Sequence, residues 1–138
     1  MSYVQLWIGV NSMSEHDQTK AVVSWFKRQY PKYAECLVGS ANGSHISGNV
    51  YQRKNKMDKL KAEGLKPGAS DFFIAVPRGG KAGLWVEMKD VKLTWSYVKK
   101  NQRAHIDLMR EMGYEAIWCA GSDIAIAAIK TYMSQGND

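Results

Sequence analysis

The stretch from residue 66 to residue 89 constrains the fold most. It contains two short apolar runs, 72–76 and 84–89, and both are rich in the aromatic and β-branched residues that favour strands. Between them, residues 77–83 hold one proline and three glycines, enough to reverse the chain. The stretch is therefore predicted to form a β-hairpin.

Charged residues gather at one end of this predicted hairpin. Successive side chains of a strand point to opposite faces, so Glu87 and Lys89 share a face. Asp71 opens the first strand and can approach them. Two carboxylates and an ammonium group suit a Mg²⁺ site, because Mg²⁺ binds through one or two carboxylates and retains several waters. The same short pattern also fits a surface salt bridge on a half-solvated strand.

The size and charge of the chain suggest one domain with a polyanionic partner. It has 138 residues, and 19 Lys and Arg against 13 Asp and Glu give a net charge of +6. This balance favours association with phosphates but does not specify a fold. Cations form two clusters, which are either phosphate contacts or solvated helix faces: Arg53, Lys54, Lys56, Lys59 and Lys61 in one, and Lys92, Lys99, Lys100 and Arg103 in the other.

The two cysteines and the absence of targeting signals indicate a cytoplasmic protein. Cys36 and Cys119 each lie in an apolar run that resembles a strand, so both are expected to be buried and reduced. Residues 1–10 are apolar, but they lack the basic start of a signal peptide. No run reaches membrane-spanning length.

The first predicted helix carries an acid at its inward face. Ser14 is expected to cap this helix, which runs to about residue 29 before Pro31. Stepping back from its apolar stripe by three or four residues reaches Gln18 and then Glu15. Glu15 therefore either faces the interior or simply favours the positive end of the helix dipole.

The remaining pattern predicts an α/β domain with a mixed central sheet flanked by helices. The expected elements are a strand at 33–38, a basic helix at 53–63, the hairpin, a helix from 95 or 96 to 113, a strand at 115–120 and a helix from 122 or 123 to 133. Residues 3–10 are either an edge strand or a segment that packs on a partner.

The long helix at 95–113 has an amide in its inward stripe. Gln102 interrupts the apolar series Val98, Ile106, Met109 and Met112, so it either bonds core backbone or lines a polar site. His105 lies beside this stripe and is expected to be a packed histidine.

These features together resemble the PD-(D/E)xK nuclease superfamily, and more narrowly the virus-type replication-repair nuclease (VRR-NUC) domain, over residues 15–132. The resemblance is carried by the Asn42-Gly43 loop, the 60–68 approach, Asp71, Glu87-Met88-Lys89, and Ser96 and Gln102 ahead of Gly113-Tyr114. It implies a restriction-endonuclease-like core. Ser70 stands where this family usually has proline, which alters the turn but leaves the acid in place.

The resemblance also implies roles for individual residues. Asp71, Glu87 and Glu15 match metal-binding acids, Lys89 matches the catalytic lysine, and Gln102 matches a glutamine of the site. The implied cofactor is Mg²⁺ or Mn²⁺, and the implied reaction is hydrolysis of DNA phosphodiesters. The expected DNA contacts are Arg53, Lys54, Lys56, Lys59, Lys66, Lys99, Lys100 and Arg103.

Stand-alone members of this family resemble phage enzymes that act as homodimers on branched DNA. We therefore expect one domain over residues 1–138, with residues 1–13 contributing to a dimer interface. Holliday junctions are the preferred substrate, because a twofold dimer matches their symmetry. The alternatives are a less selective nicking or restriction-like nuclease and a nucleic-acid-binding module without catalysis.

Overall fold

The computed structural model describes residues 13–40 and 46–137, and its element order is the predicted one. The predicted strand or packing segment at residues 3–10 lies outside these ranges. The elements are α2 (Glu15–Gln29), the 3₁₀ helix η1 (Pro31–Cys36), β1 (Leu37–Gly39), α3 (Val50–Ala62), β2 (Phe72–Ile74), β3 (Leu84–Lys89), the 3₁₀ helix η3 (Trp95–Tyr97), α4 (Lys100–Glu111), β4 (Glu115–Ala120) and α5 (Ser122–Met133).

The four strands form one mixed sheet in the order β1-β2-β3-β4. The predicted hairpin is confirmed, because β2 pairs antiparallel with β3. β1 also lies antiparallel to β2, whereas β4 is parallel to β3 after the chain crosses over through α4. The predicted α/β class with a mixed sheet flanked by helices is confirmed.

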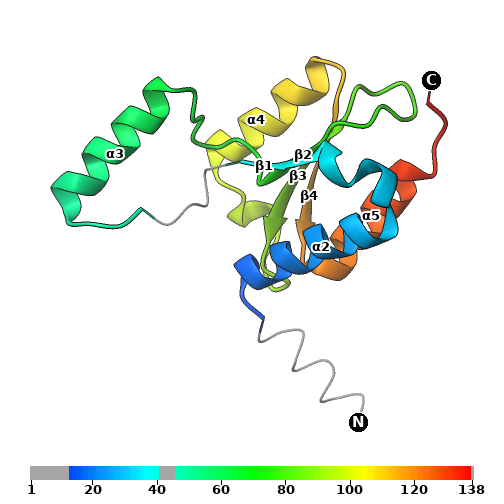
Figure 1. Ribbon diagram of the computed structural model, residues 1–138, viewed down its shortest axis with the longest axis horizontal. Coiled ribbons are helices and arrows are strands. Elements are labelled where there is room, and N and C mark those ends of the chain that lie inside the picture. Colours follow the sequence, from blue (N-terminus) through cyan, green and yellow to red (C-terminus); the bar gives the residue numbers. More distant parts are fainter. Residues whose placement is uncertain (1–12, 41–45, 138) are drawn as a thin grey trace, which may run out of the picture.

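Helices cover the two faces of the sheet unequally. In Figure 1, α2 and α5 lie together on one side of the strands and α4 lies on the other. The main core is on the α2 and α5 side, where alternate residues of β2 and β3 meet the apolar stripes of both helices. Its fully buried members include Phe72, Ile74, Leu84, Val86 and Met88 from the strands, with Val22, Phe26, Ala125 and Ile129 from the helices. The α4 side therefore receives the opposite set of strand side chains.

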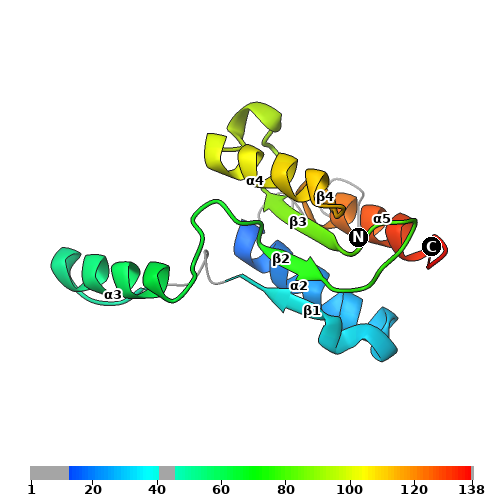
Figure 2. The same cartoon turned by 90° about the horizontal axis from the view of Figure 1, so that it is seen from above.

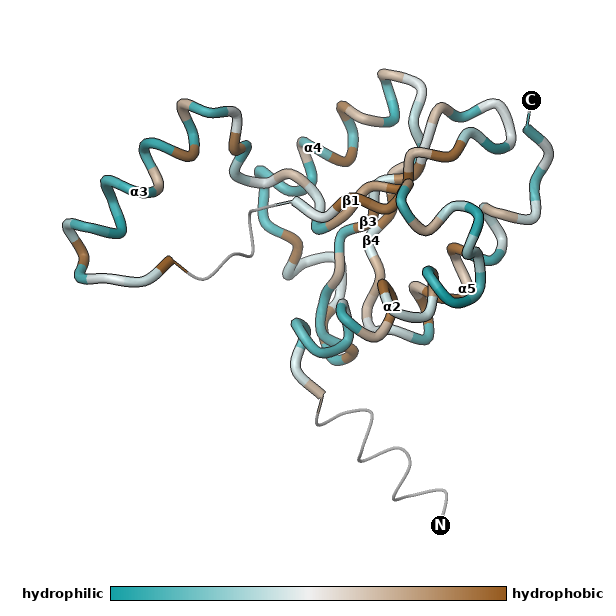
Figure 3. The backbone as a smooth tube through the Cα atoms, viewed as in Figure 1, coloured by the Kyte–Doolittle hydropathy of each residue, from teal (hydrophilic) through white to brown (hydrophobic). Residues whose placement is uncertain are grey.

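Helix α3 stands away from the rest of the molecule (Figures 1 and 2). It is well capped, because Asn49 and Gln52 form reciprocal bonds at its start, but none of its residues is buried. Figure 3 shows that its residues are mainly hydrophilic, yet Val50 and Tyr51 are 75% and 74% exposed. An isolated helix of this length is marginal in water, so packing on a partner would stabilise it.

Two predicted elements were wrong in part, and so was the expected burial of one residue in each. The predicted strand at 33–38 is mostly η1, because Pro31 opens a 3₁₀ turn in which the Tyr33 amide donates to the Tyr30 carbonyl at 2.9 Å. Cys36 therefore ends this helix, and it is half-buried, whereas Cys119 is buried in β4 as expected. Both thiols are free.

The predicted helix at 95–113 is also interrupted. Val98 and Lys99 have extended backbone between η3 and α4, so the helix proper begins at Lys100. Met112, assigned to its inward stripe, follows the last helical residue and is 59% exposed. No helix within residues 13–40 and 46–137 is long and apolar enough to cross a membrane.

Candidate active site

Two carboxylates meet on adjacent strands at the end of the hairpin. Phe72 pairs with Val86, so one further step of this register sets Asp71 opposite Glu87. Asp71 is also tied to β3 directly, because its Oδ2 accepts a hydrogen bond from the Met88 amide at 2.6 Å. This bond holds one carboxylate oxygen against the strand and thereby fixes the direction of the other. The predicted approach of Asp71 to Glu87 is present.

Glu87 and Lys89 form a buried ion pair on the same face of β3. Glu87 Oε1 lies 3.6 Å from Lys89 Nζ, and the two side chains are only 3% and 8% exposed. The surface salt bridge considered from the sequence is therefore not what the fold contains. Burial and the charge of Asp71 raise the pKa of Glu87 to about 8, even though Lys89 opposes the shift. A second cation beside these acids would relieve that repulsion.

Glu15 faces the same cluster from the first turn of α2. Burial is the main cause of its raised pKa, which the charge of Lys89 lowers and the charges of Asp71 and Asp90 raise further. These interactions favour the inward placement of Glu15 over a role only at the helix dipole. Glu15 also contributes to the raised pKa of Glu87.

Gln18 anchors the start of α2 and was not predicted as a site-forming residue. It is fully buried, its Nε2 donates to the Met13 carbonyl at 3.1 Å, and its Oε1 accepts from the Ser122 amide at 3.0 Å. Gly121 has a positive φ of 99° and sits close to Gln18, so α5 begins against this amide. The available sequence signal was a glutamine one helical turn before Val22, in line with the apolar stripe of the helix.

The donor set suits a divalent cation held by two carboxylates. Within the described part of the chain, no group of three or more His, Cys, Asp or Glu side chains is placed to hold a metal ion. The predicted set of Asp71, Glu87 and Glu15 is therefore not preformed as three ligands. Asp71 and Glu87 nevertheless fit Mg²⁺ or Mn²⁺, which need only one or two carboxylates beside water and phosphate oxygens. The pKa of Glu87 is raised because Lys89 only partly offsets its burial and the charge of Asp71.

Gln102 and Arg103 are both engaged in building the start of α4. Gln102 is half-buried, and its Oε1 accepts from the Lys99 amide at 3.0 Å, which explains an amide at this position locally. Arg103 donates to the carbonyls of Val98 at 2.8 Å and Trp95 at 2.6 Å and stacks its guanidinium on the Trp95 ring. The catalytic role of Gln102 and the DNA contact of Arg103 stay predictions.

The other predicted DNA-binding cations lie on exposed surfaces in two places. Lys99 and Lys100 begin α4, and Lys99 acts on the pKa of Glu15 and is therefore near the acids. The remaining members lie on α3 and the turn after it, namely Arg53, Lys54, Lys56, Lys59 and Lys66. Within α3, Lys54 pairs with Asp58 at 3.1 Å. Lys66 lies near His105 of α4, whereas the cations of α3 are on a helix that stands away from the sheet (Figure 1).

A comparison with known protein families matches residues 13–123 to the VRR-NUC domain. The chain belongs to the VRR-NUC domain family. It is also similar to a solved structure described as a VRR-NUC domain protein, with a TM-score of 0.72 and 26% sequence identity over 91% of this chain and 93% of the other. A search of curated proteins finds no match.

VRR-NUC membership confirms the resemblance on which the residue roles were based. A VRR-NUC domain is a nuclease domain of the PD-(D/E)xK type, its substrate is DNA, and members of this superfamily typically depend on a divalent metal. Asp71 directly precedes β2 and the Glu-x-Lys sequence lies in β3, and the roles of these residues as metal ligands and catalytic lysine stay predictions.

Proposed function

We propose that this VRR-NUC protein is a Mg²⁺- or Mn²⁺-dependent endodeoxyribonuclease that acts on branched DNA, including Holliday junctions. The observation that carries the proposal is the cluster that the half-buried Asp71 forms with the buried pair of Glu87 and Lys89. Two carboxylates approach each other in a site where little solvent compensates their charge, and one lysine pairs with Glu87. Such a cluster destabilises the metal-free fold and is explained by binding a cation and a phosphate.

Each residue of the cluster has a distinct role in this proposal. Asp71 and Glu87 hold the cation, which supplies Lewis-acid stabilisation of the charge that develops on the phosphate. Lys89 is held by Glu87 at 3.6 Å. Its ammonium group would position the attacking water and stabilise charge on the phosphate oxygens. Glu15 adds negative charge that favours the cation without joining the two ligands.

Two separate basic surfaces support branched DNA as the substrate. Lys99 and Lys100 lie near the acids, whereas the cations of α3 project well away from them (Figure 1). A continuous duplex passing the acids needs only the first surface. A substrate with several arms can occupy both at once.

We also propose that the protein acts as a homodimer. Each chain has one cluster and cuts one strand, so a twofold dimer would cut the two opposed strands of a junction. The exposed Val50 and Tyr51 of α3 offer apolar surface for a second copy. Light scattering that gives a monomeric mass would refute the dimer and leave the nuclease assignment intact.

The function is tested by cleavage of labelled four-way junction, flap and linear duplex in Mg²⁺, Mn²⁺ or chelator. Paired cuts in the junction that require metal would support the proposal. Equal cutting of all three substrates would favour the less selective nuclease. DNA binding without cutting in any metal would leave only the nucleic-acid-binding module.

A further inference from the structure

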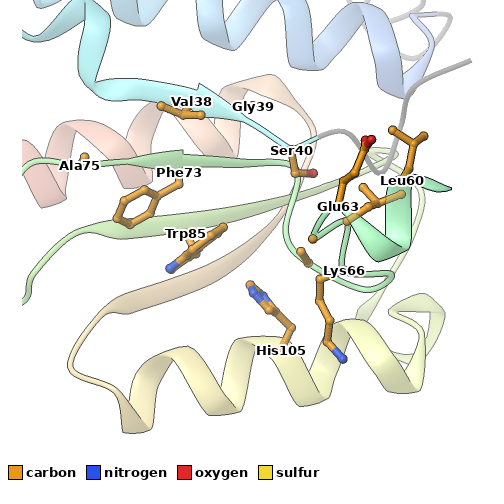
Figure 4. Close-up of a pocket in the computed structure, with 13 residues that line it drawn as sticks. Val38, Gly39, Ser40, Leu60, Glu63, Lys66, Phe73, Ala75, Trp85 and His105 are labelled. Atoms are coloured by element: carbon orange, nitrogen blue, oxygen red, sulfur yellow. The ribbon is translucent and has the colours of Figure 1, made fainter. Parts of the chain in front are cut away.

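A cavity of about 660 Å³ lies on the α4 side of the sheet, beside the acid cluster. Its walls come from β1, β2 and β3, from the chain that links α3 to β2, and from α4 (Figure 4). The volume falls within the range of small-molecule sites. The proposed roles of Asp71, Glu87 and Lys89 make no use of it.

The floor of the cavity is a row of apolar side chains across three strands. Val38 pairs with Phe73, and Phe73 pairs with Trp85, so all three project from the same face. The Phe73 and Trp85 rings lie 4.5 Å apart with an interplanar angle of 31°. His105 from α4 closes one side, with its ring edge against Trp85 at 4.9 Å. Figure 4 shows Phe73, Trp85 and His105 along this wall.

Two polar atoms of the cavity wall are buried and unpaired. Within the described ranges, the Ser40 hydroxyl and the Trp85 Nε1 have no hydrogen-bond partner. Burying such groups without a partner costs about 1–3 kcal/mol each, so a small rotation of either side chain toward a polar ligand in the cavity would be favourable. The indole can only donate and the hydroxyl can donate or accept, so a ligand that relieves this cost must offer at least one acceptor. A purely apolar occupant does not meet this requirement.

The cavity continues the face on which the acids lie. Phe73 follows Asp71 by two residues on the hairpin's first strand, and Trp85 precedes Glu87 by two residues on the second, so each pair shares a face. Two residues of a strand span about 6.6 Å, close to the rise of two base steps. The backbone at Ser40 also touches the site, because its amide donates to the Asp71 carbonyl at 2.8 Å. If a DNA strand places a phosphate at Asp71 and Glu87, a neighbouring base of that DNA strand is therefore within reach of the cavity.

We propose that this cavity binds one unpaired nucleobase next to the phosphate that is cut. The base stacks against Phe73 and Trp85, and it accepts a hydrogen bond from the indole or from Ser40. Lys66 at the rim, beside His105 in Figure 4, supplies positive charge for the adjoining backbone. This inference rests on the proposed nuclease function and narrows its substrate to DNA with an unpaired nucleotide at the branch.

The test measures how tightly the protein binds a forked DNA in chelator. It combines DNA that lacks one base with protein variants in which the cavity is filled. An abasic nucleotide is placed at each position around the fork in turn. Stacking on an aromatic side chain is worth about 1–3 kcal/mol per base, so at one position the abasic fork should bind wild-type protein roughly tenfold more weakly. Ala75→Trp, which fills the cavity from its exposed side, should remove that difference. Ala127→Trp on the exposed surface of α5 is the matched control and should retain it.

Two gentler variants test the polar contacts. Ser40→Ala removes the unpaired hydroxyl, and Trp85→Phe removes the indole N–H while keeping an aromatic ring. Each should reduce the penalty of the abasic position and leave binding of fully paired duplex unchanged.

The proposal is overturned if no abasic position weakens wild-type binding, if the fork does not bind in chelator, or if Ala75→Trp behaves as wild type. A change in oligomeric mass of Ala75→Trp would assign the cavity to a second copy of the chain instead. The readout needs no cleavage, so failure of the nuclease assay and failure of this inference are distinguished.

Discussion

Replacing Glu87 by glutamine should stabilise the metal-free protein at alkaline pH. Burial and Asp71 raise the pKa of Glu87 from 4.5 to about 8, so the folded state holds a proton there that the unfolded chain has released. An acid whose folded pKa is raised contributes stability fully below pH 4.5, and this contribution is lost as the pH rises toward 8 and above. Glutamine carries no charge at any pH and avoids the loss.

The magnitude follows from the same pKa change. One pKa unit corresponds to ~1.4 kcal/mol. A rise from 4.5 to about 8 therefore lowers the wild-type free energy of unfolding by at most roughly 4 kcal/mol between pH 4.5 and 8, relative to Glu87→Gln. The quantity to compare is the change with pH in the difference between the two free energies of unfolding. The difference at a single pH also contains the loss of the ion pair with Lys89, which Glu87→Gln removes at every pH.

Urea unfolding in chelator between pH 5 and 8.5 measures this change. Wild type, Glu87→Gln and the control Glu111→Gln, an exposed carboxylate in the last turn of α4, are compared. The control should follow wild type, whereas Glu87→Gln should gain several kcal/mol over wild type as the pH rises. Mn²⁺ should then stabilise wild type and not Glu87→Gln. A difference between Glu87→Gln and wild type that stays constant over this range would refute the electrostatic reasoning.

Three further outcomes are expected. Gln18→Ala removes both buried hydrogen bonds of its amide, so urea unfolding should show a loss of about 2–4 kcal/mol, whereas the exposed Gln29→Ala should cost little. Burial and a neighbouring lysine lower the pKa of His105, so stability should be complete above pH 6.5 and should fall below it, and His105→Gln should lack this fall in the same titration. Burial raises the pKa of Cys119 to about 12, so a thiol reagent should modify it only on unfolding, after the half-buried Cys36.

The hairpin was predictable from sequence because its signal is local. Alternation along a strand has period two, so the shared face of Glu87 and Lys89 follows from their spacing alone. Asp71 required one further assumption, the pairing of the two strands, which the reversal at residues 77–83 supplied. The register then set the acid opposite Glu87.

The features that sequence missed depend on contacts between distant parts of the chain. In the sequence, Gln18 is one polar residue among others in a predicted helix. Its role becomes clear only from the structure, where the Ser122 amide at the start of α5 donates to its side chain. The cavity depends on pairing β1 with β2, which brings Val38 and Ser40 beside the hairpin. The break before α4 was missed because Lys99 and Gln102 form a cap from residue types that do not identify one.

The central claim is that Asp71 and Glu87 bind the metal ion, whereas Lys89 does not bind it and acts on the attacking water and the phosphate. The decisive measurement is Mn²⁺ binding by calorimetry together with single-turnover cleavage of a four-way junction, for wild type, Glu87→Gln and Lys89→Met. The account predicts that Glu87→Gln loses both metal binding and cleavage. Lys89→Met should bind Mn²⁺ at least as tightly as wild type, because one repelling charge is gone, and yet cleave no junction. Unchanged cleavage in either variant, or loss of Mn²⁺ binding in Lys89→Met alone, would contradict it.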